Sequence, residues 1–204
     1  MKKTLWIPLL LAVLLTGCGP TASKTISKSE KKAMDISYSP IVCKYSVHPG
    51  WGSVIDCIST NIQINDDNTV TIFYGDFWDP TNFETTVSLD YIYGETFEIT
   101  EEQKQSVITA IQKNKIYKIG DCGDKDSCDG GNSYIYLFNA DGEVVHTCGG
   151  YNPHIDQFEN TRTAILDVLP ENALRDTDNK TTEVLIQYLL DHYPEHYEWL
   201  KDSQ

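Results

Sequence analysis

The sequence lacks the motifs that mark common catalytic folds. It has no G-x-S-x-G elbow, which residues 50–53 match only in part, no Walker-type phosphate loop and no G-x-G-x-x-G motif. Basic residues are also few. The chain has 16 Lys and Arg and 30 Asp and Glu, which give a net charge of −14. Nucleic acid repels so acidic a chain. We therefore expect no nucleic-acid partner, no enzymatic activity and no cofactor.

Long apolar runs are missing except for one at the amino terminus. Lys2 and Lys3 precede the run from Leu5 to Leu15, which is too short to span a bilayer as a mature helix and suits an export signal. The segment that follows, Leu15-Thr16-Gly17-Cys18, resembles the lipobox of bacterial lipoproteins. That resemblance implies cleavage before Cys18 and a lipid, with acyl chains such as palmitate, on its thiol. We expect a protein anchored by lipid to the extracytoplasmic face of the cell membrane.

The domain organisation follows from these features and from local composition. Residues 1–17 are predicted to be the signal peptide, and residues 18–37 the lipidated cysteine with a polar tether rich in Lys, Ser and Thr. Residues 38–170 have the size and apolar content of one domain. Residues 171–204 are predicted to be a polar connector and an amphipathic helix that packs on this domain.

Alternation of apolar and polar residues predicts an antiparallel sheet. The predicted strands cover residues 41–47, 54–58, 62–64, 70–72, 85–93, 96–99, 133–139 and 144–148. The Asp141-Gly142 pair predicts a tight hairpin between the last two strands, in which Cys148 faces Ile135.

Three segments have helical patterns. Thr100 and Gln103 form a capping box at the start of a helix that runs to about Asn114. Asn152 before Pro153 predicts the start of a second helix, which stops at Pro170. The third helix follows the connector and ends at Pro194. We therefore expect an α+β fold, an antiparallel sheet of hairpins with two or three helices on one face or end.

Five cysteines follow Cys18, and export to an oxidising compartment permits disulfides. If Val47 faces Ser53 across a turn, Cys43 faces Cys57 at a separation that a disulfide spans. This pattern predicts a Cys43–Cys57 disulfide, and the alternative is two buried thiols on one face of the sheet.

The other three cysteines lie in the second half of the chain. Cys122 and Cys128 close a short loop and are predicted to form a second disulfide, with Cys148 left as a buried thiol. A zinc site made by these thiols with His146 or His154 is disfavoured, because the spacing matches no zinc knuckle.

Two further patterns resemble metal sites. His192 to His196 fits the H-x-x-E-H pattern of inverted zinc peptidases, but Pro194 interrupts the helix that would bring both histidines to one face. An acidic loop fails the EF-hand template and leaves open a calcium site of another kind, or a solvated turn. Its carboxylates are Asp121, Asp124, Asp126 and Asp129. No metal ligand is predicted.

Aromatic residues in turns are the candidate binding residues. Trp51 lies in one turn, and Phe77 and Trp78 lie in another. Exposed aromatic rings provide flat contact area at small entropic cost, which suits binding of a protein or a glycan. The alternative is that these rings fold back and cover the ends of the sheet.

One stretch of the body carries a second resemblance. Residues 128–131, a Tyr-rich strand, the Asp-Gly turn and residues 149–153 are similar to a pattern in small lipoproteins of Gram-positive bacteria. With the capped helix before it, this pattern covers about half of the mature chain. It implies a membrane-anchored protein and assigns no functional residue.

Three functional hypotheses follow from the sequence. The first is a non-enzymatic surface lipoprotein that binds an envelope protein or a glycan. The second is a metal- or thiol-dependent protein, either a hydrolase or a redox partner, that uses a zinc or calcium site or the thiols of Cys122, Cys128 and Cys148. The third is an immunity or inhibitor lipoprotein, acidic because its target is basic.

Overall fold

The described part of the chain forms one sheet with helices packed against it. A computed structural model describes residues 40–50, 58–75, 77–78, 86–87, 92–124, 126 and 130–198. In this part, six antiparallel strands form a sheet of order β6-β3-β2-β1-β7-β8, and β4 and β5 form a separate pair. The strands are β1 (Ile41–His48), β2 (Ser59–Asn65), β3 (Thr69–Gly75), β4 (Phe77–Trp78), β5 (Thr86–Val87), β6 (Tyr93–Glu98), β7 (Asn132–Phe138) and β8 (Val144–Tyr151).

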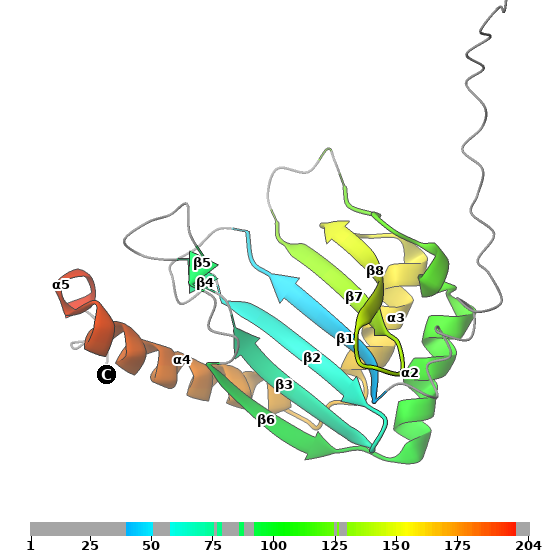
Figure 1. The fold of residues 1–204 in the computed structure, drawn as a ribbon, viewed down its shortest axis with the longest axis horizontal. Helices are drawn as coiled ribbons and strands as arrows, with labels where there is room; N and C mark the ends of the chain where they lie inside the picture. The colour runs from blue at the N-terminus through cyan, green and yellow to red at the C-terminus, as the bar shows by residue number, and fades with distance from the viewer. Residues whose placement is uncertain are drawn as a thin grey trace, which may run out of the picture.

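The helices confirm the expected α+β fold. They are α2 (Glu101–Lys113), the 3-10 helix η2 (Ile116–Lys118), α3 (Asp156–Leu166), α4 (Ala173–His192) and α5 (Pro194–Tyr197). In Figure 1, α3 and the first turns of α4 lie behind the sheet, so one face of the sheet is covered by helices and the other faces the viewer. Within the described residues, none of the helices has the length and apolar character needed to cross a membrane.

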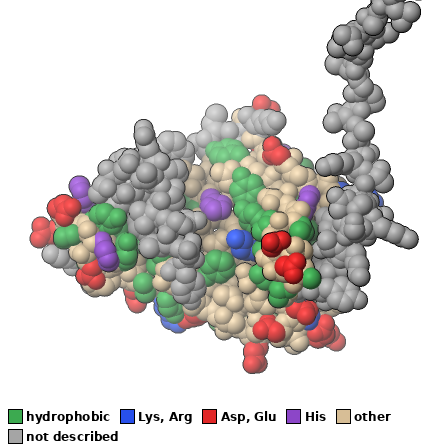
Figure 2. All heavy atoms as spheres, in the orientation of Figure 1, with side chains coloured by type: hydrophobic (Ala, Val, Ile, Leu, Met, Phe, Trp, Pro, Cys, Tyr) green, Lys and Arg blue, Asp and Glu red, His purple; other side chains and the backbone are tan. Residues whose placement is uncertain are grey.

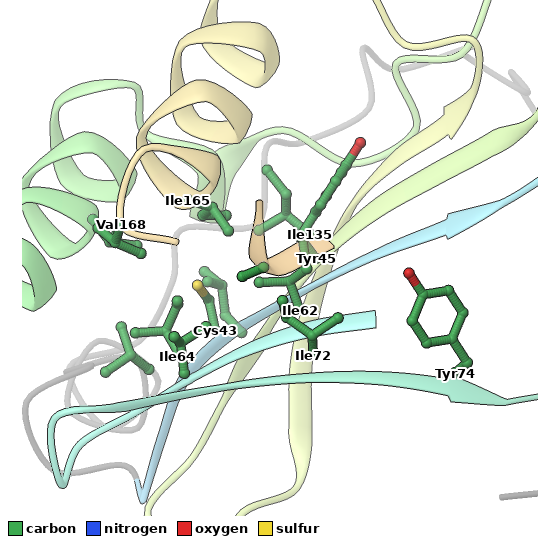
Figure 3. Packing of buried hydrophobic residues seen from close by; sticks show 14 of the residues in the cluster. Cys43, Tyr45, Ile62, Ile64, Ile72, Tyr74, Ile135, Ile165 and Val168 are labelled. Carbon is green, nitrogen blue, oxygen red and sulfur yellow. The ribbon is translucent and has the colours of Figure 1, made fainter. Parts of the chain in front are cut away.

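The core lies between the sheet and the helices. Strand alternation sends Cys43 and Tyr45 of β1, with Ile62 and Ile64 of β2, to the helix side, where all four are buried. Ile165 of α3 packs onto them from above (Figure 3). The period of two in the sequence is therefore the direct cause of the one-sided core.

Two predictions from local sequence are confirmed. Thr100 caps α2, with its hydroxyl accepting from the Gln103 amide while the Gln103 side chain accepts from the Thr100 amide. The β7–β8 hairpin turns at Asp141-Gly142, and Cys148 pairs with Ile135 as expected. Both patterns depend on residues close in sequence, which is why the sequence alone reveals them.

Three helix boundaries differ from the prediction, and one of them is the end of α3, which lies at Leu166 rather than next to Pro170. The second predicted helix, α3, begins at Asp156 with Ile155 as its N-cap, because Asn152 adopts a left-handed conformation (φ 44°) that a helix start does not have. The polar connector, predicted at the start of residues 171–204 and extending to residue 180, is instead part of α4 from Ala173 onward.

The first turns of α4 are polar, yet two threonines of this region are buried because their hydroxyls form hydrogen bonds within the helix. The hydroxyl of Thr177 donates to the Ala173 carbonyl, and that of Thr181 donates to the Thr177 carbonyl, each at 2.7 Å. Both side chains are almost fully buried and continue the stripe formed by Leu185 and Leu189. A threonine that bonds within its own helix can face the core, so this stripe is not visible as an apolar pattern.

The first predicted hairpin has another register. Val47 pairs with Thr60 and Cys43 pairs with Ile64, so the expected pairing of Val47 with Ser53 is wrong. Residues 54–57 of the predicted second strand lie outside the described residues, as do residues 1–39. Of the strand predicted over residues 85–93, the described strand residues are the β5 pair and Tyr93.

Candidate functional site

The face of the sheet opposite the helices carries a row of polar and aromatic side chains. Tyr134 and Tyr136 of β7 have ring centroids 6.0 Å apart, and the ring of His48 packs edge-on against Tyr134 at 6.2 Å. Lys44 places its Nζ atom 4.8 Å from the centre of the Tyr136 ring. In Figure 2, which shows this side of the molecule, most acidic side chains lie toward its edges.

Polar side chains on this face are satisfied by one another. Ser46 donates to the Oδ1 atom of Asn61 at 2.6 Å, and Ser59 is hydrogen-bonded to His48 Nδ1 at 2.7 Å. Ser46, Ser59 and Asn61 are all buried. Buried and paired polar groups of this kind fix the positions of the rings beside them.

A hollow of about 670 Å³ adjoins this row at the ends of β7 and β8. This volume lies in the range of small-ligand sites, roughly 300–1,000 Å³. We call it the tyrosine–aspartate pocket. Its described lining consists of Gly120, Asp121, Gly123, Asp124, Asn132, Tyr134, Thr147, Gly149, Gly150 and Tyr151.

One wall of the pocket is the segment from Gly120 to Asp124, which lies along β8. Asp121 forms a parallel bridge with Gly149, in which the Cys122 amide donates to the Gly149 carbonyl at 2.8 Å and the Gly149 amide donates to the Gly120 carbonyl at 3.1 Å. The Asp124 amide donates to the Tyr151 carbonyl at 2.7 Å. Backbone hydrogen bonds therefore hold both aspartates at the edge of the sheet.

This close approach requires glycine in β8. Gly149 and Gly150 have φ values of +146° and +147°, which L side chains rarely adopt. A Cβ atom on Gly150 would lie 2.7 Å from Asp121 Oδ1 and 2.8 Å from the Gly123 nitrogen. The Gly-Gly pair therefore makes room for the wall that carries the aspartates.

The pocket is negatively charged. Asp121 and Asp124 are the charged residues of its described lining, and both are acidic. The Oδ1 atom of Asp121 accepts from the Gly123 amide at 3.0 Å, and that of Asp124 accepts from the Asp126 amide at 2.9 Å. These bonds fix the two carboxylates in orientation, and tyrosine rings flank them.

Two thiols lie behind the same wall. Cys122 and Cys148 each follow or precede a residue of the Asp121–Gly149 bridge, so their side chains point to the core side, where each thiol influences the pKa of the other. Burial raises the pKa of the Cys122 thiol, and it raises the pKa of Cys148 to about 12.

The predicted disulfides are not formed in the structure. Cys43, Cys122 and Cys148 are free thiols, and Cys43 lies opposite Ile64. Cys57 and Cys128, the predicted partners of Cys43 and Cys122, lie outside the described residues, as does the predicted lipidation site Cys18.

The predicted aromatic binding residues are not described at the level of side chains. Trp51 lies outside the described residues. Phe77 and Trp78 form β4, in which they pair with Val87 and Thr86 of β5, and their side chains are not described. The hypothesis that they bind a ligand stays a prediction.

Metal ligands do not gather in the described part of the chain. No group of three or more His, Cys, Asp or Glu side chains there is placed to hold a metal ion. His192 stacks on Tyr188 with ring centroids 4.1 Å apart, at the end of α4, whereas His196 lies on α5 beyond Pro194. His146 Nε2 lies 2.9 and 2.8 Å from the carbonyls of Ile116 and Ile119, which gives that ring a structural role.

Comparison with known proteins adds no family to this description. Neither a protein-family model nor a curated protein sequence matches the chain. The residues of the pocket that sequence reasoning missed are Asn132, Tyr134, Thr147 and Tyr151. These residues lie on the polar side of the alternating pattern of β7 and β8, next to a Gly-Gly pair, so the sequence contained part of the information that locates the pocket. The bridge to Asp121, however, has no local sequence signature.

Proposed function

We propose that this protein is a lipid-anchored binding module of the cell envelope, whose tyrosine–aspartate pocket holds a basic side chain of a partner protein. The observation that carries the proposal is the pocket itself, in which Asp121 and Asp124 lie beside Tyr134 and Tyr151. The lipobox-like segment ending at Cys18 supports the anchored location.

The negative charge of the pocket favours a ligand of positive charge. Two fixed carboxylates without a basic residue in the described lining attract a Lys or Arg side chain and repel anions. The net charge of −14 extends this attraction to longer range, because it steers basic partners toward the protein at low ionic strength.

The tyrosines suit the same ligand. A cation within about 6 Å of a tyrosine ring is stabilised by the ring quadrupole. The sheet already has one such contact, between Lys44 and Tyr136. A partner's cation that enters the pocket meets the next rings of this face, Tyr134 and Tyr151, together with the carboxylates.

Binding of a fluorescent tetralysine peptide to the full-length protein tests the proposal. The double variant Asp121→Asn/Asp124→Asn removes both charges and keeps both amide-accepting oxygens, so it preserves the local turns. We expect its affinity to fall about tenfold, which corresponds to ~1.4 kcal/mol.

A charge-matched double variant serves as the control. Asp126→Asn/Asp141→Asn also removes two exposed carboxylates, and neither residue belongs to the described lining. We expect it to retain nearly all of the affinity. Equal losses in both variants mean that only net charge attracts the peptide, and absence of binding to the wild type also contradicts the proposal.

A further inference from the structure

The two thiols behind the pocket wall come from segments far apart in the sequence. Cys148 lies in β8 and is fully buried, whereas Cys122 lies in the segment after η2 and is partly buried against the core. The Asp121–Gly149 bridge aligns these segments and places Cys122 and Cys148 on its core side, where each thiol influences the pKa of the other. Cys43, in contrast, lies opposite Ile64 of β2.

We infer that Cys122 and Cys148 are a redox pair that closes to a disulfide behind the tyrosine–aspartate pocket. Both side chains lie on the same side of the paired segments, and the bond requires the two sulfurs to approach to about 2.05 Å. The segment of Cys122 is joined to β8 by a few backbone hydrogen bonds rather than by a full strand ladder, so it is less constrained than a strand of the sheet.

The reaction with a disulfide oxidant is a two-electron exchange. The more exposed thiol, Cys122, loses its proton and attacks the oxidant RSSR, which forms a mixed disulfide and releases one thiolate RS⁻. Cys148 then loses its proton and attacks the Cys122 sulfur, which forms the Cys122–Cys148 bond and releases the second RS⁻. The protein is oxidised by two electrons, and the oxidant is reduced to two thiols.

The burial of both thiols sets the rate of this reaction. Thiolates are the nucleophiles in the exchange, and burial raises the pKa of both thiols. Closure is therefore slow at neutral pH and accelerates as the pH rises. Once formed, the disulfide links the segment that carries Asp121 covalently to β8. This link does not depend on which ligand the pocket binds.

Oxidation of the full-length protein with oxidised glutathione tests the pairing directly. After free thiols are alkylated, digestion without reduction is expected to give one peptide pair joined through Cys122 and Cys148, with a loss of about 2 Da for the two hydrogens. Cys128→Ser is the matched control and is expected to give the same pair.

Single variants separate the two steps. In Cys148→Ser, Cys122 is expected to remain as a stable mixed disulfide with glutathione, because the resolving thiol is missing. A Cys122–Cys128 link in the wild type, or alkylation of both Cys122 and Cys148 after prolonged oxidation at pH 9, overturns the inference. Neither result depends on peptide binding, so the proposed function is tested separately.

Discussion

Gly150 is the residue on which the shape of the pocket depends most. Its positive φ and its contacts with Asp121 and Gly123 leave no room for a side chain. We predict that Gly150→Ala destabilises the fold by about 1–3 kcal/mol, because the methyl group strains the backbone and pushes the wall away. Denaturant unfolding measures the loss of stability, and tetralysine affinity measures the damage to the pocket.

Gly120→Ala provides the control for this change. Gly120 also belongs to the pocket lining, but a Cβ atom there meets nothing within 4 Å and its φ is not in the restricted region. We expect its stability to stay close to that of the wild type. Equal destabilisation by both alanines contradicts the role given to Gly150.

Cys43 makes stability depend on pH in the alkaline range. Burial raises the pKa of this thiol from 9.0 to about 12 in the folded protein, so the unfolded chain loses the proton first. The contribution is fully present below pH 9 and is lost as the pH rises toward 12. We predict that the free energy of unfolding falls above pH 9, by up to about 1.4 kcal/mol per pH unit from this group.

Chemical denaturation at pH 7, 9 and 10.5 under reducing conditions measures this slope. Cys43→Ala is expected to be less stable at pH 7, because it leaves a small cavity, and to lose stability less steeply above pH 9. The prediction fails if the variant and the wild type have the same alkaline slope.

At the level of elements, the capping box of α2 is the clearest link from sequence to stability. Thr100 accepts a hydrogen bond from the Gln103 amide at 3.1 Å. We predict that Thr100→Ala lowers the unfolding free energy by about 1 kcal/mol, because an amide of the first turn loses its partner. The exposed Thr109→Ala in the same helix is the control, and thermal unfolding in which both variants behave alike would contradict the prediction.

The elements also show how far the sequence predicts this structure. Hairpins and helix caps depend on residues that are close in sequence, so the Asp141-Gly142 turn and the Thr100 cap could be predicted from the sequence. The first turns of α4 could not be predicted, because Thr177 and Thr181 face the core as polar residues and give no apolar pattern. Their hydroxyls are satisfied by hydrogen bonds within the helix. The pocket was missed for another reason: it needs residue 121 beside residue 149, a contact that no local pattern specifies.

At the scale of the whole molecule, the proposed function requires attachment to the membrane through Cys18. We predict that radiolabelled palmitate enters the wild-type protein in a bacterial host and that Cys18→Ser abolishes the labelling, because the acylated thiol is missing. Fractionation of the variant is not a readout of the anchor, because loss of Cys18 also removes the cleavage site and leaves the apolar run of residues 5–15 on the chain. Unlabelled wild type, or a variant that still takes up the label, rejects the anchor.

Hydrogen–deuterium exchange of the full-length protein with and without tetralysine shows whether the peptide binds in the tyrosine–aspartate pocket, because it locates the bound peptide. We predict slower exchange in residues 120–124 and 147–151, which form two walls of the tyrosine–aspartate pocket, and unchanged exchange at the tip of the β7–β8 hairpin, residues 139–143. Protection that is spread evenly over the acidic surface, or confined to other segments, contradicts a binding site in this pocket.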